Sequence, residues 1–178
     1  MDLLDLLNST GGTNSVSELA GAVGLGSQDT SKLIGALAPA LLGGLQKNTK
    51  SDEGLAGLRK ALETGGHERY VENPSLLRDA ATRADGNKIL GHIFGSKDVS
   101  RNVAGHAAKE TGIDASIIKK ALPLLAGLAM GAMSKKSAGG RELGSSESSG
   151  GLGPLGDLIG GGDGFGLDDV LGLARKFF

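Results

Sequence analysis

The feature that most constrains the fold is an apolar run late in the chain. Residues 121–133 read ALPLLAGLAMGAM and carry no charge, amide or hydroxyl. These thirteen positions fall short of the roughly twenty that a membrane-spanning helix needs, but they are typical of a helix buried in a protein core. Gly127 and Gly131, one helical turn apart, leave room for another helix to approach closely. The run therefore predicts a core helix, from about Asp114 to Lys135, and not a membrane element.

An earlier run, ALAPALLGGL, resembles this one. Residues 31–45 align with residues 115–129 so that Pro39 pairs with Pro123, Leu41 with Leu125 and Gly43 with Gly127, and so that Leu33 and Ile34 pair with Ile117 and Ile118. Duplication of a helix-turn-helix unit explains the match, and so does chance, because Ala and Leu match easily in so simple a composition. The shared proline is the least trivial part of the alignment. The two runs predict similar helices packing in one core.

The composition favours helices throughout. The chain has no Trp, one Tyr and four Phe among 178 residues, so its core must be built from Leu, Ile, Val and Ala. Strand-forming residues are scarce, and small residues with leucine suit closely packed helices. We therefore expect an all-α fold, a compact bundle of short and medium helices.

Glycine-rich and polar stretches predict where the helices end. The turn-rich NSTGGTNS separates a first short helix over residues 3–7 from a second, SVSELAGAVG. Gly86, Gly95 and Gly112 indicate boundaries of helices near 86–94 and 97–110.

The domain organisation follows from the same change in composition. Residues 1–135 form the predicted helical domain, with halves 1–65 and 75–135 if the repeat is real. Residues 136–165 are rich in Gly and Ser, which predicts a flexible linker. Residues 166–178 form a short amphipathic helix with acids at its start and bases at its end, as the helix dipole prefers. Its candidate binding residues are Leu167, Val170, Leu171, Phe177 and Phe178.

Few residues are arranged for chemistry. The densest polar cluster, His67–Tyr70, lies in a predicted loop, and His92 lies in an apolar neighbourhood where a packed or capping histidine is expected. His106 and Glu110 are four apart, the spacing of an ordinary helical contact more often than of a metal site. No pattern for a zinc protease, a nucleophile elbow or a phosphate-binding loop occurs, and cysteine is absent. We expect no metal, no cofactor and no catalytic residue.

One segment of the chain resembles a known family. Ile89-Leu90-Gly91-His92-Ile93-Phe94-Gly95, then Thr111-Gly112-Ile113-Asp114, then Leu122-Pro123 are similar to the YidB-like bacterial proteins of unknown function, of the domain-of-unknown-function 937 type. The first half matches loosely and lacks the HIFG element. The resemblance implies a small helical bacterial protein, and it implies no activity, substrate or catalytic residue.

These observations favour a non-enzymatic helical module for interaction or self-assembly, with a protein partner or a second copy as its target. One alternative is an enzyme that uses the His67–Tyr70 loop or His92. Another is attachment to a membrane surface through the terminal helix, or association with DNA through the helix-turn-helix pattern. The near-balance of 19 basic and 20 acidic residues gives no electrostatic reason to expect nucleic acid or an anionic membrane. Asp2 and Asp5 stand where a signal peptide would carry positive charge, so we expect a cytoplasmic protein.

Overall fold

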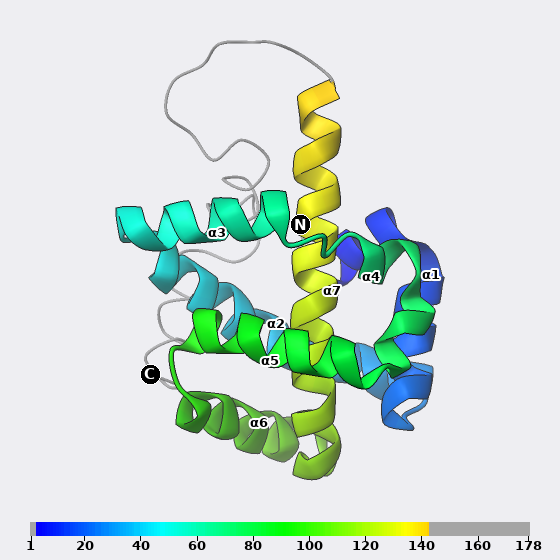
Figure 1. Cartoon of the computed structure of the whole chain (residues 1–178). Helices are drawn as coiled ribbons and strands as arrows, with labels where there is room; N and C mark the ends of the chain where they lie inside the picture. The colour runs from blue at the N-terminus through cyan, green and yellow to red at the C-terminus, as the bar shows by residue number, and fades with distance from the viewer. Residues whose placement is uncertain (1–2, 143–178) are drawn as a thin grey trace.

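The computed structural model describes residues 3–142, without the side chains of residues 11–13 and 137–142 (Figure 1). Within this part every regular element is helical, which confirms the all-α prediction. The elements are α1 (Leu3–Val23), α2 (Ser27–Thr49), α3 (Asp52–Thr64), α4 (Arg69–Glu72), the 3₁₀ helix η1 (Pro74–Arg78), α5 (Ala80–Phe94), α6 (Lys97–Thr111) and α7 (Ala115–Glu142).

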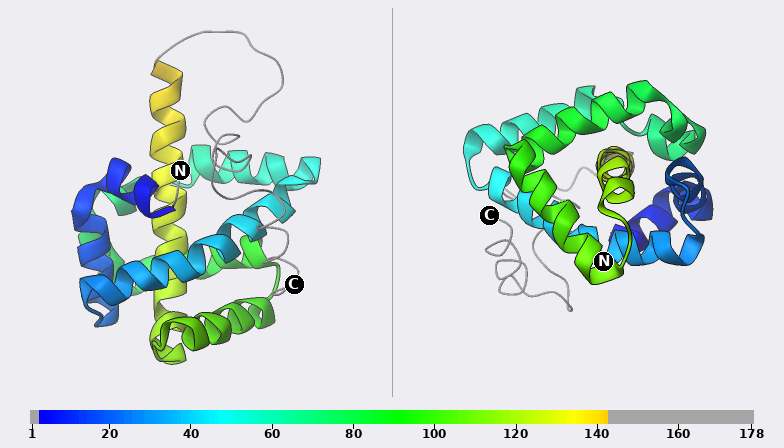
Figure 2. Two further views of the ribbon diagram at one scale, coloured as in Figure 1. Left: turned by 180° about the vertical axis from the view of Figure 1, so that it is seen from behind. Right: turned by 90° about the horizontal axis from the view of Figure 1, so that it is seen from below.

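The apolar run lies on α7, which is the central helix of the bundle. Viewed from below, α7 is seen along its axis with the other helices around it (Figure 2, right). Every residue from Ala121 to Ser134 is buried. A helix that is apolar around its whole circumference has to be enclosed on all sides, and the chain's own helices enclose this one. The prediction of a core helix is therefore confirmed.

The same helix is long and apolar enough to cross a membrane by length and composition alone. This stretch, 115–136, spans 22 residues, more than the uninterrupted apolar run suggests, and 78% of its most apolar window is buried inside the protein. Burial of this extent is typical of the core helix of a globular fold. The structure thus accounts for the apolar sequence without a bilayer.

Helix α5 crosses α7 at a glycine that the sequence suggested was a helix boundary. Gly86 lies inside α5, and the boundary is instead at Asp79, whose backbone is extended. A Cβ atom at Gly86 would lie 2.5 Å from the carbonyl carbon of Pro123 and closer still to its oxygen. The glycine is therefore needed because two backbones meet there, and the prediction of a helix starting at residue 86 was wrong.

The predicted ends of α5 and α6 are confirmed. Gly95 and Gly112 follow the two helices with φ of 72° and 74°, the left-handed conformation that glycine adopts without strain. Ser96 then caps α6, because its hydroxyl accepts a hydrogen bond of 3.3 Å from the amide of Val99. These two turns fold the chain back on itself on either side of α6.

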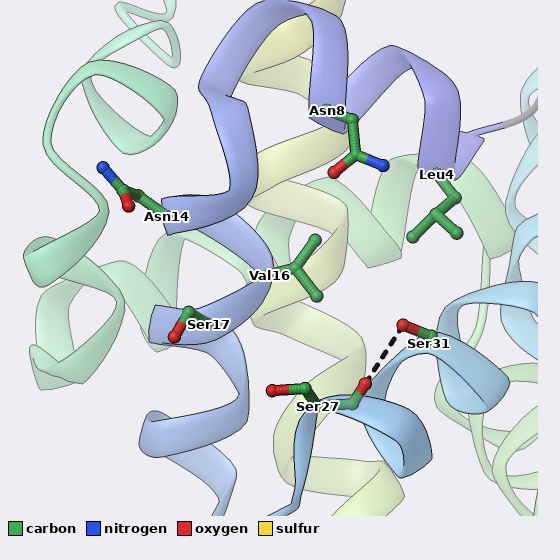
Figure 3. Close-up of a pocket in the computed structure, with 7 residues that line it drawn as sticks. All are labelled: Leu4, Asn8, Asn14, Val16, Ser17, Ser27 and Ser31. Atoms are coloured by element: carbon green, nitrogen blue, oxygen red, sulfur yellow. Dashed lines mark hydrogen bonds between the residues drawn. The ribbon is translucent and has the colours of Figure 1, made fainter.

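The prediction of two short helices at the N-terminus was wrong. NSTGGTNS is part of one helix, α1, which changes direction between Asn8 and Asn14 (Figure 3). The hydroxyls of Ser9 and Thr10 both donate to the carbonyl of Leu6, which occupies hydroxyls that would otherwise favour a turn. Packing of the leucines on both sides of this stretch against the bundle outweighs its low helix propensity.

The two matched runs have the same local structure. Both α2 and α7 contain an internal proline, and both follow a left-handed glycine, Gly24 or Gly112. Their surroundings differ, because α7 is central and α2 is one of the helices around it (Figure 2). Helix α7 also continues to Glu142, past the predicted end at Lys135, so the first residues of the predicted linker are helical.

Candidate functional site

The polar cluster at His67–Tyr70 is positioned by two glycines at the end of α3. Gly66 has a φ of +57°, and a Cβ at Gly65 would collide with the imidazole of His67. The chain can therefore turn sharply and place His67 against the end of α3. The single turn α4 follows, closed by a hydrogen bond of 2.8 Å from the amide of Asn73 to the carbonyl of Arg69.

This turn packs against α7 at two glycines, Gly127 and Gly131. A Cβ at Gly131 would meet the carbonyl oxygen of His67 and, at 3.0 Å, the side chain of Val71. A Cβ at Gly127 would lie 3.4 Å from the ring of Tyr70. The close approach expected at this glycine pair is present at Gly131, whereas an added Cβ at Gly127 would make an ordinary contact. The approaching segment is the turn that contains α4.

A network of polar side chains joins α4 to α5. The Tyr70 hydroxyl donates to Oδ2 of Asp85 at 2.7 Å. Nη2 of Arg69 donates to the Tyr70 hydroxyl at 2.8 Å and to the same carboxylate oxygen at 3.2 Å. The Arg69 guanidinium also lies over the Tyr70 ring, 4.8 Å from its centre. Tyr70 is only 2% exposed, whereas the side chains of Arg69 and Asp85 are 54% and 26% exposed. The hydrogen bonds of the Tyr70 hydroxyl therefore connect a core residue to two residues nearer the surface.

His67 lies beside the network without joining it. Its side chain is 8% exposed, and its Nδ1 atom is buried without a hydrogen-bond partner, 3.8 Å from Oδ2 of Asp85. That separation is too long for a hydrogen bond. The imidazole instead stacks on Tyr70, with ring centres 6.1 Å apart.

Burial and these contacts set the charges of the cluster. Burial lowers the pKa of His67, although attraction to Asp85 opposes the effect. Burial also raises the pKa of Tyr70, and its hydrogen bond to Asp85 acts in the same direction. For Asp85, burial alone would raise the pKa, but the Tyr70 hydrogen bond and the nearby His67 and Arg69 together lower it. At neutral pH the cluster therefore contains a neutral imidazole, a neutral phenol, a carboxylate and a guanidinium.

This arrangement is better suited to holding α4 against α5 than to transferring protons. The carboxylate that could orient His67 already accepts hydrogen bonds from Tyr70 and Arg69, and the raised pKa of Tyr70 keeps its proton in place. The sequence did not indicate Asp85 as a member of the cluster. It lies on α5, far along the chain from the loop, and its one signal is the adjacent Gly86, where α5 meets α7.

The other two histidines lie apart from this cluster. His92 is exposed in the last turn of α5, so of the two predicted roles the packed one was wrong and the capping one stays a prediction. Its carbonyl accepts a hydrogen bond of 3.1 Å from Asn48. His106 and Glu110 approach to 4.0 Å on the surface of α6, as expected of a helical contact. Within residues 3–142 no group of three or more His, Asp or Glu side chains is placed to hold a metal ion.

A groove lies between α1 and the start of α2, and no sequence pattern indicated it. Its volume is about 390 Å³, and Figure 3 shows the side chains around it. The lining residues are neutral: Leu4, Asn8, Asn14, Val16, Ser17, Ser27 and Ser31. Such a groove offers hydrogen bonds but no general acid or base, and none of its residues belongs to the His67 cluster.

Helix α3 presents an apolar face that is only partly covered. Leu55, Leu58, Ala61 and Leu62, which we call the α3 face, share one side of this helix by helical spacing. Of these four, only Leu58 is buried. Figure 1 and the left view of Figure 2 show α3 extending sideways from α7. One hydrogen bond of 3.0 Å, from Ser134 to the carbonyl of Leu62, ties α3 to α7. The predicted binding residues Leu167, Val170, Leu171, Phe177 and Phe178 lie outside the described residues.

Comparison with known families adds one finding. The model of a bacterial protein family of unknown function, DUF937, matches residues 5–136, which include every element described above except the first two residues of α1 and the end of α7. The chain belongs to this family. The match extends over the first half of the helical part, where the resemblance read from the residues was only loose. Comparison with curated proteins and with solved structures gives no match.

Proposed function

We propose that this protein is a non-enzymatic interaction module, in which the helical bundle is a scaffold and the C-terminal segment 166–178 engages a protein partner or a second copy. The observation that carries the proposal is the contrast between its two kinds of surface. The polar cluster around Asp85 is occupied by internal hydrogen bonds, whereas the α3 face leaves Leu55 partly exposed beside Ala61 and Leu62, which pack only partly against the core.

The buried state of α7 supports this proposal over DNA binding. A recognition helix reads base edges with exposed polar side chains. The second helix of the α6–α7 pair is buried from Ala121 to Ser134, and its exposed lysines, such as Lys119 and Lys120, lie near its start. We therefore place the interaction surface on α3 and the C-terminal segment, and we expect it to act in the cytoplasm.

The test compares the full chain with the double variant Leu171→Asp and Phe178→Asp, which places charge on the apolar side of the C-terminal segment. Leu158→Asp, in the predicted linker, is the matched control. Each form is used to capture proteins from its native host, and its molar mass is measured by light scattering over a range of concentrations.

We expect the double variant to lose a captured partner, or an oligomer, that the unaltered chain and the control retain. Identical captured proteins and identical molar mass for all three forms would refute the proposal. Turnover of a substrate that is abolished by His67→Gln, in a variant that remains folded, would favour an enzyme instead.

A further inference from the structure

We propose that the α3 face is the docking site for the chain's own C-terminal segment, residues 167–178. This inference goes beyond the proposed function: it gives the segment a docking site within its own chain, from which a protein partner or a second copy would have to release it. Three observations carry it: the incomplete cover of the α3 face, the charges of the two parts, and the length of chain between them.

The first observation is the way in which α3 is attached. At its C-terminal half, Leu62 is tied to α7 through the hydrogen bond from Ser134, and Leu58 is buried. At its N-terminal half, Leu55 is only partly covered, although it shares a side of the helix with Leu58 and Leu62. Helix α3 has 13 residues, the same number as 166–178, so the helix predicted from the sequence of that segment is long enough to lie along all of α3.

The second observation is charge complementarity. Residues 1–142 contain 17 basic and 15 acidic residues, whereas residues 143–178 contain 2 basic and 5 acidic residues. Exposed bases flank the C-terminal half of the proposed site, Arg59 and Lys60 on α3 and Lys135 on α7, whereas the exposed acids Asp52 and Glu53 lie at the start of α3. Asp168 and Asp169 open the C-terminal segment, next to its apolar residues. Attraction between these groups favours docking and makes it sensitive to salt.

The third observation is reach. The end of α7 at Glu142 lies about 12 Å beyond Ser134, and Leu55 lies about 10 Å along α3 from Leu62, by the rise of an α-helix. Along the two helices the segment therefore has to return over at most about 22 Å. The 24 residues from 143 to 166 have a root-mean-square span of about 27 Å if they behave as a Gly-rich chain. A tether that exceeds the required distance so slightly gives an effective concentration in the millimolar range, which favours docking within one molecule.

The experiment uses the absence of cysteine from the chain. Leu55→Cys is combined with Leu171→Cys in the full-length protein, and the pair is joined at about 1 µM protein with a short bis-maleimide. The control pair is Ala81→Cys with Leu171→Cys, because Ala81 is exposed on α5 and not on α3. Circular dichroism verifies that both forms are folded, and intact mass distinguishes intramolecular from intermolecular products.

We expect the Leu55 pair to give an intramolecular product at a yield about tenfold above the control pair, since a docked site raises the local concentration. Adding Val170→Asp should return the yield to the control level. Equal yields for the two pairs, or a product that forms only between molecules, would overturn the inference.

The two proposals can fail separately. If capture of a partner depends on Leu171 but the Leu55 pair gives no intramolecular product, the segment docks elsewhere and the interaction function stands. If the product forms but neither capture nor molar mass depends on Leu171, docking stands and the interaction function falls.

Discussion

Replacing Gly86 by alanine should destabilise the fold, although the change improves helix propensity. The added Cβ would lie 2.5 Å from the carbonyl carbon and 2.9 Å from the Cα of Pro123, where ordinary contacts are 3.4–4 Å. The opposing atoms are backbone, so they cannot rotate away, and α5 has to move from α7.

The magnitude follows from two opposing terms. Overpacking of a tight core costs about 1–3 kcal/mol, and a clash with backbone belongs at the upper end of that range. Alanine gains about 1 kcal/mol over glycine inside a helix. The net loss should be about 2 kcal/mol in the free energy of unfolding, which lowers Tm by roughly 8 °C for a domain of this size.

Gly91→Ala is the matched control on the same helix. No atom lies within 4 Å of a Cβ at Gly91, so only the gain in propensity applies, and this variant should be stabilised by about 0.5–1 kcal/mol. Urea unfolding followed by circular dichroism measures both. If Gly86→Ala were as stable as the unaltered chain, the close crossing of α5 and α7 at Pro123 would be refuted.

Four further outcomes are expected. Tyr70→Phe removes the 2.7 Å hydrogen bond to Asp85 and should cost about 1–2 kcal/mol in urea unfolding, and an unchanged midpoint would show that the network does not fasten α4. Burial lowers the pKa of His67 below its usual value of 6.5, so the unfolded chain takes up a proton first as pH falls. The stability that neutral His67 contributes is therefore complete above about pH 6.5 and is lost as pH falls toward the folded pKa, and His67→Gln should flatten this part of a stability profile between pH 7.5 and 5. Gly112→Ala forces a side chain into a φ of 74° and should cost about 1 kcal/mol or more in thermal unfolding, a loss that an equally stable variant would disprove. Truncation after Glu142 should leave the helical circular dichroism of the bundle intact, and loss of cooperative unfolding would show that the bundle depends on the removed segment.

The buried helix and two helix ends could be predicted from the sequence, because they depend on residues that lie close together in the chain. The apolar run at 121–133 could only be stable if enclosed, and Gly95 and Gly112 mark helix ends because a left-handed residue ends a helix locally. The close approach at Gly131 was predicted from the same local pattern, without the identity of the element that approaches.

Tertiary packing determined what the sequence did not predict. Residues 8–15 contain turn-forming residues, yet they are helical because the flanking leucines pack against the bundle. Gly86 was predicted to be a helix boundary because the sequence alone does not distinguish a glycine that ends a helix from a glycine that lets a second helix pack closely. The partner of Tyr70 depends on where α5 crosses α7, so Asp85 could not be found from the loop alone.

Hydrogen exchange on the full-length chain shows whether the C-terminal segment covers the α3 face. The backbone amides of residues 52–64 are compared between the unaltered protein and the Leu171→Asp, Phe178→Asp variant, with residues 80–94 of α5 as internal reference. If the C-terminal segment docks on the α3 face, α3 amides should exchange faster in the variant, while α5 amides keep their rates. Equal exchange of α3 in the two proteins would contradict the account.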